Sequence, residues 1–422
     1  MSGYRGSALQ VEHPCPQCGG PVILEETDRF LSCNYCHVRL YIFSKDYFRY
    51  YLPPSKHPES DTIFAPYWRF RGLYFSIRPF DIKNKVLDTS FSASGQEFLP
   101  ISMGLRTQTL KLKFADSEMK TTYLPNQLTV NEAISRIEKM THFFDSHEYT
   151  GRIFHKAFVG DTVSMIYAPL YIRNRAIYDG VLDRPIATLT QSRQECLEQP
   201  VGKTAWRIDF KPALCPDCGW DLSGGRDSVV LLCRNCDSAW HSVKGTFRKV
   251  DFRVVRWRDR NVIYLPCWRM SAEIEGVDLK SYADLVKTAN LPKAPKPEWR
   301  KKEIFFWAPA FRTHPHLFMR LARQMTILQP EGDYNDSFPR SAFCPVTLDS
   351  GEAFESIKVT LANIAVAKRK FFPKLPSVTI RPLKAMLVFF PFTVEGNELV
   401  QTQLKFSIQR NTIGGPEILA TS

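Results

Sequence analysis

Eight of the eleven cysteines in this chain of 422 residues fall into two sets with the same spacing. Each set reads C-x2-C-x14-C-x2-C, and the two sets lie two hundred residues apart. Their members are Cys15, Cys18, Cys33 and Cys36 in the first set and Cys215, Cys218, Cys233 and Cys236 in the second. A C-x2-C turn lets two sulfurs reach one ion, and the intervening loop folds back to bring the second pair opposite the first. The spacing therefore predicts two structural zinc ions (Zn2+), each bound by four thiolates.

The first knuckle of each set reads C-P-x-C-G, with a proline that fixes φ early in the turn and with Gly19 or Gly219 permitting positive φ at its end. This pattern resembles the zinc-ribbon family, and more loosely the bacterial zinc-ribbon proteins of the transcription-factor-B type that carry a β-rich body. The resemblance covers roughly thirty residues per set and implies a small metal-bound module. In that family the module serves nucleic acid binding, protein contacts or plain stabilisation. The second knuckles depart from the family, because His37 and Asp237 stand where glycine is usual after the last cysteine.

The likeness between the two halves extends beyond the cysteines when the sequence is shifted by two hundred residues. Trp68-Arg69 then meets Trp268-Arg269, and the match needs no gap from Cys15 onward. Three further pairs are Leu31 with Leu231, Ile63 with Ile263 and Pro66 with Pro266. We interpret the chain as an internal duplication, in which a ribbon is followed each time by an apolar segment with a proline and aromatic residues.

We expect an α+β fold, with two zinc ribbons in an internally duplicated chain and antiparallel β-rich units that carry short helices. The expected units are residues 1–45 (zinc ribbon 1), 46–200 (β-rich unit 1), 201–245 (zinc ribbon 2) and 246–422 (β-rich unit 2 with helices). Apolar patterning predicts strands at residues 63–77, 165–178, 247–257, 262–274 and 385–394. It predicts helices at residues 131–143, 279–289, 316–325 and 352–368.

Prolines interrupt five of the aromatic-rich segments, namely Pro66, Pro169, Pro266, Pro309 and Pro391. Because proline cannot donate to a ladder of hydrogen bonds, we expect these strands to lie at sheet edges or to carry bulges. Exposed edges of this kind would let a partner protein add a strand.

Basic residues are concentrated in the second half of the chain. Residues 1–200 hold 23 Lys and Arg against 21 Asp and Glu, whereas residues 201–422 hold 33 against 22. The densest stretch, residues 244–260, interleaves aromatic side chains with basic ones that could bind nucleic acid, namely Arg248, Lys249, Arg253, Arg256 and Arg258. Read as one strand, it places Arg248, Val250, Phe252 and Val254 on one face. The alternative interpretation is a solvated strand face with its aromatic rings in the core.

No motif of an enzyme is recognisable. Val201-Gly202-Lys203-Thr204 lacks the first glycine of a phosphate-binding loop, since Leu197 occupies that position. His314 and His316 have no acidic partner nearby in sequence, and a four-thiolate zinc has no open coordination position. We therefore expect a protein that is not an enzyme.

Two functions remain from the sequence. The first is a zinc-stabilised adaptor or scaffold for protein contacts in a cytosolic assembly, and the second is a nucleic-acid-binding protein that uses the second ribbon and the strand behind it. The near-neutral first half favours the adaptor. Thiolate ligands need a reducing compartment, so we expect a cytoplasmic protein. The longest apolar runs hold eight residues, so we expect no transmembrane segment, although the basic cluster at residues 368–374 leaves contact with anionic lipid open.

Overall fold

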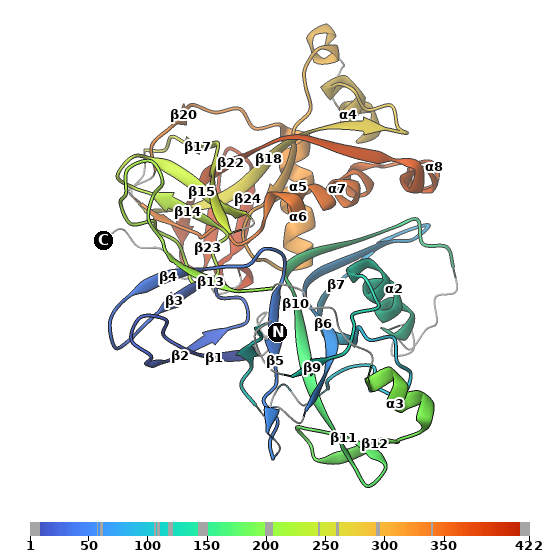
Figure 1. Cartoon of the computed structure of the whole chain (residues 1–422). Helices are drawn as coiled ribbons and strands as arrows, with labels where there is room; N and C mark the ends of the chain where they lie inside the picture. The colour runs from blue at the N-terminus through green and yellow to red at the C-terminus, as the bar shows by residue number, and fades with distance from the viewer. Residues whose placement is uncertain are drawn as a thin grey trace.

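The computed structural model describes residues 9–413 apart from residues 57, 60–61, 105–106, 108–109, 117–120, 142–150, 199–205, 244, 259–260, 293–295 and 339–340. This part of the chain is β-rich with few, short helices (Figure 1). Its strands form two eight-stranded sheets, one in each half, and three small sheets that contain the cysteine sets. The expected boundary between residues 200 and 201 and the Val201–Thr204 segment lie outside the described residues.

The first large sheet is built around a long antiparallel pair, β6 and β10. The chain order of its strands is β5 (Phe48–Tyr51), β6 (Ile63–Ile77), β7 (Ile82–Ser92), β8 (Lys113–Phe114), β9 (Thr122–Tyr123), β10 (His155–Arg173), β11 (Ala176–Asp179) and β12 (Arg184–Thr188). One path through the sheet runs β12-β11-β10-β5-β8, and β6 pairs with β10, β7 and β9.

The second large sheet repeats these pairings around β18 and β22. Its strands are β17 (Phe252–Val255), β18 (Val262–Glu275), β19 (Phe306–Pro309), β20 (Tyr334–Asn335), β21 (Ala342–Phe343), β22 (Thr379–Glu395), β23 (Glu398–Gln401) and β24 (Phe406–Gln409). Here β22 pairs with β18, β17 and β23, while β18 also pairs with β19 and β21. Each strand of one sheet therefore has a counterpart of the same connectivity in the other.

The register of the two sheets fixes which residues correspond. Trp68 lies opposite Met165, which also pairs with Arg49, whereas Trp268 lies opposite Leu387, which also pairs with Phe252. The tryptophans differ by two hundred positions, but Arg49 and Phe252 differ by three more. The gapless match from the cysteines to the tryptophans is thus wrong between the ribbon and the long strand. Relative to the first half, the second half has three more residues before β17 and three fewer between β17 and Trp268.

The four prolines in the long strands lie at interior positions and not at sheet edges, so the edge expectation is wrong for them. Pro66 pairs with Tyr167 on one side of β6. On the other side the neighbour of β6 changes from β9 to β7, and the first residue after this change is Tyr67. The carbonyl of Pro66 faces that side and accepts a hydrogen bond from Ala93 N. The N–H and C=O of a strand residue face the same neighbour. The N–H that proline lacks would therefore point to the place where β9 has ended and β7 begins, so no ladder hydrogen bond is lost there.

The same explanation holds for the other three long strands. At Pro266 the neighbour of β18 changes from β21 to β19. At Pro169 the neighbour of β10 changes from β5 to β11, and at Pro391 the neighbour of β22 changes from β17 to β23. Pro309, in the last pair of the edge strand β19, follows the edge expectation. The other expected feature, a bulge, is present in each long pair as a register shift, between Gly160 and Thr162 and between Ser271 and Ala272, but away from these prolines.

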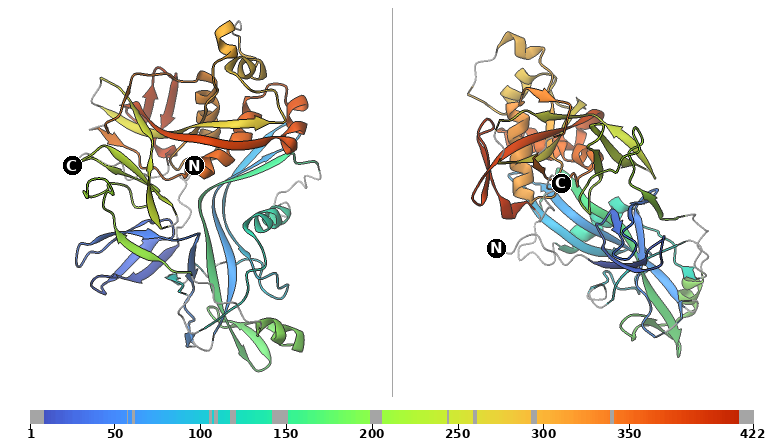
Figure 2. Two further views of the ribbon diagram at one scale, coloured as in Figure 1. Left: turned by 45° about the horizontal axis from the view of Figure 1, so that its top comes forward. Right: turned by 90° about the vertical axis from the view of Figure 1, so that its left-hand side faces the viewer.

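The helices pack beside the two sheets (Figures 1 and 2). They are α2 (Val130–Thr141), α3 (Gln191–Leu197), α4 (Tyr282–Thr288), α5 (Pro315–Leu328), α6 (Ser350–Glu355), α7 (Ile357–Ile364) and α8 (Lys368–Phe371), with short 3-10 turns at Pro297–Arg300, Phe372–Ser377 and Arg410–Thr412. The single helix expected at residues 352–368 is wrong. It breaks at Ser356, whose hydroxyl donates to the carbonyl of Ala353 at 2.7 Å and so ends α6.

The two halves share a hydrophobic core. The far ends of β6 and β10 contribute Leu73, Phe75, Ala157 and Val159 to a cluster whose other members come from the second half. The ring of Phe75 lies 5.9 Å from that of Phe318 in α5. In Figure 2 the long blue and green strands accordingly reach up to the layer formed by β18, β22 and the helices.

Candidate metal centres

The cysteines of each set converge on one point. In the first set Cys15 Sγ lies 3.7 Å from Cys36 Sγ, and Cys18 Sγ lies 3.6 Å from Cys33 Sγ. All four sulfurs lie within 4.8 Å of one another, as do those of the second set. Four sulfurs at about 2.3 Å from a central zinc would be about 3.8 Å apart in a regular tetrahedron. The spacing of the sulfurs therefore suits a four-coordinate metal ion, and two cysteine clusters that could hold metal are present.

The second set has the same geometry. Cys215 Sγ lies 3.6 Å from Cys236 Sγ, and Cys218 Sγ lies 3.5 Å from Cys233 Sγ. The thiols of one set cannot all ionise at these separations without a cation, because each thiolate raises the free energy of ionising the next. Burial raises the pKa of Cys233 to about 12, whereas in Cys215 hydrogen bonds led by that of Ser238 outweigh burial and lower the pKa to about 6. A bound cation would remove this conflict by stabilising four thiolates together.

The first knuckles have the same backbone geometry in both sets. Gly19 has φ 73° and Gly219 has φ 74°, a region in which a side chain is strained. The amide of each glycine donates to the carbonyl of the first cysteine of its set at 2.8 Å. Glycine at this position is therefore required by the turn itself.

The second knuckles use the left-handed conformation without glycine. His37 has φ 59° and Asp237 has φ 48°. Aspartate tolerates this region better than most residues, and the Asp237 carboxylate accepts a hydrogen bond from Phe338 N at 2.9 Å. The departure from the usual glycine thus leaves the turn unchanged.

A serine supports the second cysteine set but has no counterpart in the first. The hydroxyl of Ser238 lies 3.1 Å from Cys236 Sγ and accepts a hydrogen bond from the indole of Trp240 at 2.8 Å. Its own proton is then directed to sulfur, as second-sphere groups do at metal sites. Val38 occupies the matching position in the first set. Sequence reasoning missed this residue, although its place two positions after the last cysteine was visible.

The segments that hold the two cysteine sets pack against each other. The first set lies among β1 (Gln10–Pro14), β2 (Pro21–Glu25), β3 (Phe30–Ser32) and β4 (Arg39–Phe43), and the second among β13 (Asp209–Pro212), β14 (Val230–Cys233), β15 (Ser238–Val243) and β16 (Thr246–Val250). Strand β13, which leads into the second set, pairs with β4 of the first. Tyr41 donates to the carbonyl of Ser228 at 2.9 Å, and Arg226 pairs with Asp28 at 2.5 Å. Each segment therefore stabilises the position of the other.

The basic stretch at residues 244–260 is not one strand, and the expected faces are wrong. It divides at Asp251 into β16, in the small sheet beside the second cysteine set, and β17, in the second large sheet. The ring of Phe252 is buried and stacks on Phe338 with centroids 4.2 Å apart. Lys244 and Arg260 lie outside the described residues.

Most of the basic side chains singled out from the sequence have acidic partners. Lys249 pairs with Asp217 at 2.6 Å, Arg253 with Asp336 at 3.1 Å and Arg256 with Asp333 at 3.4 Å. Arg248 and Arg258 are exposed. The structure places these five residues along two sheets and a loop, and it does not bring them to a common cavity.

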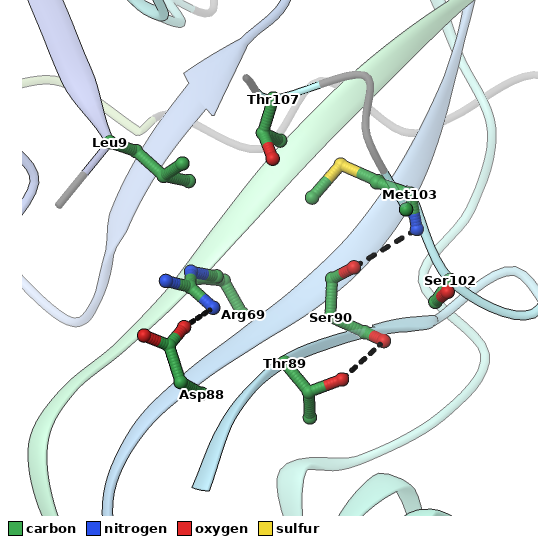
Figure 3. Close-up of a pocket in the computed structure, with 9 residues that line it drawn as sticks. Leu9, Arg69, Asp88, Thr89, Ser90, Ser102, Met103 and Thr107 are labelled. Atoms are coloured by element: carbon green, nitrogen blue, oxygen red, sulfur yellow. Dashed lines mark hydrogen bonds and ion pairs between the residues drawn. The ribbon is translucent and has the colours of Figure 1, made fainter. Parts of the chain in front are cut away.

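The first half also contains a buried charge network that sequence reasoning missed. Arg69 Nη2 lies 2.9 Å from Glu26 Oε1, and Arg69 also pairs with Asp88. Glu26 is fully buried. Arg69 and Asp88 line a cavity of about 300 Å³. Figure 3 shows them paired with each other, near Ser90, which accepts a hydrogen bond from Met103 N. The repeated Trp-Arg pair in the sequence pointed to Arg69, but its acidic partners Glu26 and Asp88 are not close to it in sequence.

Comparisons with protein-family models, with curated proteins and with solved structures found no match. Among the described residues, no helix is both long and apolar enough to span a bilayer.

Proposed function

We propose that the protein is a zinc-stabilised scaffold that is not an enzyme and that docks a protein partner through its two metal-bound cysteine sets. In this proposal the chain is an internal duplication of a zinc ribbon and a β-rich unit, and both tetrads hold Zn2+ in a structural role. Four thiolate ligands leave no open coordination position for catalysis. The proposed location is the cytosol, where the thiolates remain reduced.

The observation that carries the proposal is one exposed aromatic ring on each set of knuckles. Tyr35 has 64% and Trp220 has 61% of its surface exposed. The two rings do not occupy matching positions in the two cysteine sets. At the spacing of two hundred residues, Tyr35 matches Asn235 and Trp220 matches Gly20, so each set has its aromatic residue where the other set has a small or polar one. Aromatic rings on rigid supports are typical binding hot spots, since little conformational entropy is lost on docking.

Docking by strand addition at the proline-containing strands is not part of the proposal, because four of these strands are central in their sheets. Nucleic acid binding is the alternative function. The acidic partners of Lys249, Arg253 and Arg256 weigh against it, since a phosphate would have to displace them.

The scaffold proposal is tested by purifying the protein from nuclease-treated cells and identifying stoichiometric partners. Replacing Tyr35 and Trp220 together by Ser should release the partner while both metals stay bound. Phe80→Ser is the matched control, because Phe80 is equally exposed, at 67%, but lies in the turn between β6 and β7. A partner that the double variant retains would contradict docking through the knuckles.

A further inference from the structure

A second cavity lies where the two halves and the two cysteine-bearing segments meet. Its volume is about 500 Å³, within the range of sites for small organic molecules. The lining comes from β4 and the segment that leads to β5, from β10, from β15, and from the N-terminal turns of α2 and α6. Residues separated by more than three hundred positions, Arg29 and Glu352, therefore face the same space.

Two polar groups of this cavity are unsatisfied. The Nη1 atom of Arg29 and the hydroxyl of Thr162 are buried and have no hydrogen-bond partner among the described residues. The Arg29 guanidinium lies over the ring of Phe48, 4.4 Å from its centroid, and no carboxylate of the described residues pairs with it. Thr162 is 5% exposed. Leaving such groups unpaired in a buried site costs free energy, more so for a charged group, and a ligand that pairs with them recovers it.

The acidic groups of the cavity are already engaged. His241 Nε2 lies 2.5 Å from Asp349 Oδ2. Asp46 holds Arg49 through two contacts of 2.7 Å, and Glu352 accepts a hydrogen bond from Gly160 N at 2.9 Å. Among the described residues, none of these carboxylates forms an ion pair with the guanidinium of Arg29, whose Nη1 atom has no hydrogen-bond partner.

We propose that this cavity binds a small organic acid, whose carboxylate or phosphate group pairs with Arg29 and accepts a hydrogen bond from Thr162. The three engaged carboxylates would repel a polyanion, which limits the ligand to one acidic group. His241, held by Asp349, lies at the same cavity and offers a further polar contact to the ligand.

The position of Arg29 supports a ligand-binding role over a structural one. The carbonyl of Arg29 accepts a hydrogen bond from Ile42 N in β4, and that of Val229 accepts one from Ser242 N in β15, so the two residues hold equivalent positions just before β3 and β14. Since valine makes the same backbone hydrogen bond at position 229, the backbone does not require an arginine at position 29. Both residues line the cavity, and the pair creates one charged and one apolar wall.

The test is calorimetric titration of the full-length, metal-loaded protein with inorganic phosphate and, separately, with acetate, at low ionic strength. The anion that binds more tightly identifies the acidic group of the ligand as a phosphate or a carboxylate. Arg29→Met, which keeps the length of the side chain, should weaken binding at least about tenfold, equivalent to 1.4 kcal/mol. Thr162→Val preserves volume and should weaken binding about threefold to tenfold. The control is Arg248→Met, which removes an exposed arginine outside the cavity and should have no effect.

Metal content and the far-UV circular dichroism spectrum establish whether the Arg29→Met variant folds. If that variant does not fold, the affinity of the Thr162→Val variant decides the test. The proposal is overturned if the unaltered protein binds neither anion saturably. It is also overturned if Arg248→Met weakens binding as much as Arg29→Met does, since binding would then follow net charge alone.

Discussion

The indole Nε1 of Trp68, in β6 of the first large sheet, donates a hydrogen bond of 2.7 Å to the carbonyl of Leu128, in the segment between β9 and α2. Leu128 is followed by the residue that caps α2, so this bond fixes the start of the helix against the strand. The second half has the same arrangement, in which Trp268 donates to Leu348 at 2.8 Å immediately before the cap of α6. Both tryptophans are at least 98% buried, at 2% and 1% exposure.

Replacing Trp68 or Trp268 by Phe should therefore destabilise the protein in each case. Each substitution leaves a buried carbonyl unpaired at about 1–3 kcal/mol, and replacement by Ala should cost about 3–5 kcal/mol because it also empties the site. Urea unfolding measures the loss. Trp220→Phe, at an exposed position, should change the unfolding free energy by less than about 0.5 kcal/mol. Equal losses at all three tryptophans would contradict this account.

Metal analysis should return two zinc ions per chain. Structural zinc contributes about 10–16 kcal/mol of apparent folding free energy in small modules at neutral pH, so removing a ligand should unfold its surroundings. Cys18→Ser should lose one ion, and Cys218→Ser the other. Because β13 pairs with β4, loss of either ion should also loosen the other cysteine segment, which hydrogen exchange of β4 would detect. Retention of both ions in either variant would refute the ligand assignment.

Replacing Glu26 by Leu should cost about 3–5 kcal/mol, because Arg69 then keeps its charge in a buried site with less compensation. The double variant Glu26→Leu with Arg69→Met should recover part of this loss, since both charges are removed. Unfolding free energies of the four proteins give the coupling. Removing Glu273, an exposed partner of Arg381 at 3.0 Å, should cost at most about 1 kcal/mol and serves as the control.

Stability should fall as the pH drops from about 6.5 toward 4. Burial, and then the charge of Lys358, lower the pKa of His155 from 6.5 to about 4. Below pH 6.5 the unfolded chain binds a proton that the folded chain does not, so folding is disfavoured progressively, by up to roughly 3 kcal/mol. Above pH 6.5 the effect vanishes. His155→Phe should flatten the slope, whereas His316→Phe at an exposed position should not. The comparison between variants cancels any acid-induced loss of metal.

Oligonucleotide binding should be weak and blind to sequence. Should Arg248, Arg253, Arg256 and Arg258 contact phosphates instead, affinity for a single strand would fall with log salt at a slope near −0.7 per phosphate neutralised. Replacing all four by Gln would then flatten the slope by up to about three units. Sub-micromolar binding at physiological salt, abolished by these substitutions with both metals retained, would establish nucleic acid as the ligand in place of a protein.

The second sheet contained a sequence signal that a shift of two hundred residues does not reveal. At a shift of 220 the match includes Pro125 with Pro345, Leu128 with Leu348, Glu132 with Glu352 and Ala133 with Ala353. Loops of unequal length separate this segment from the long strands, so the matching shift changes along the chain. The equivalence became evident through shared hydrogen bonds, because Ala93 and Ala310 accept from the same positions before each helix.

The sequence by itself determined the two cysteine clusters and the long strand at Ile63–Ile77, because short-range spacing and apolar patterning are sufficient for both. The tertiary structure decided where the prolines lie, since that depends on which strand adjoins each side of β6, β10, β18 and β22. The tertiary structure also decided which charged and polar side chains are paired and which are not. Arg29 and Thr162 were unremarkable in sequence, and their unpaired groups line one cavity only because β10 and the segment around β3 and β4 fold against the second half. Long-range packing sets which polar groups lose water, and local sequence does not record it.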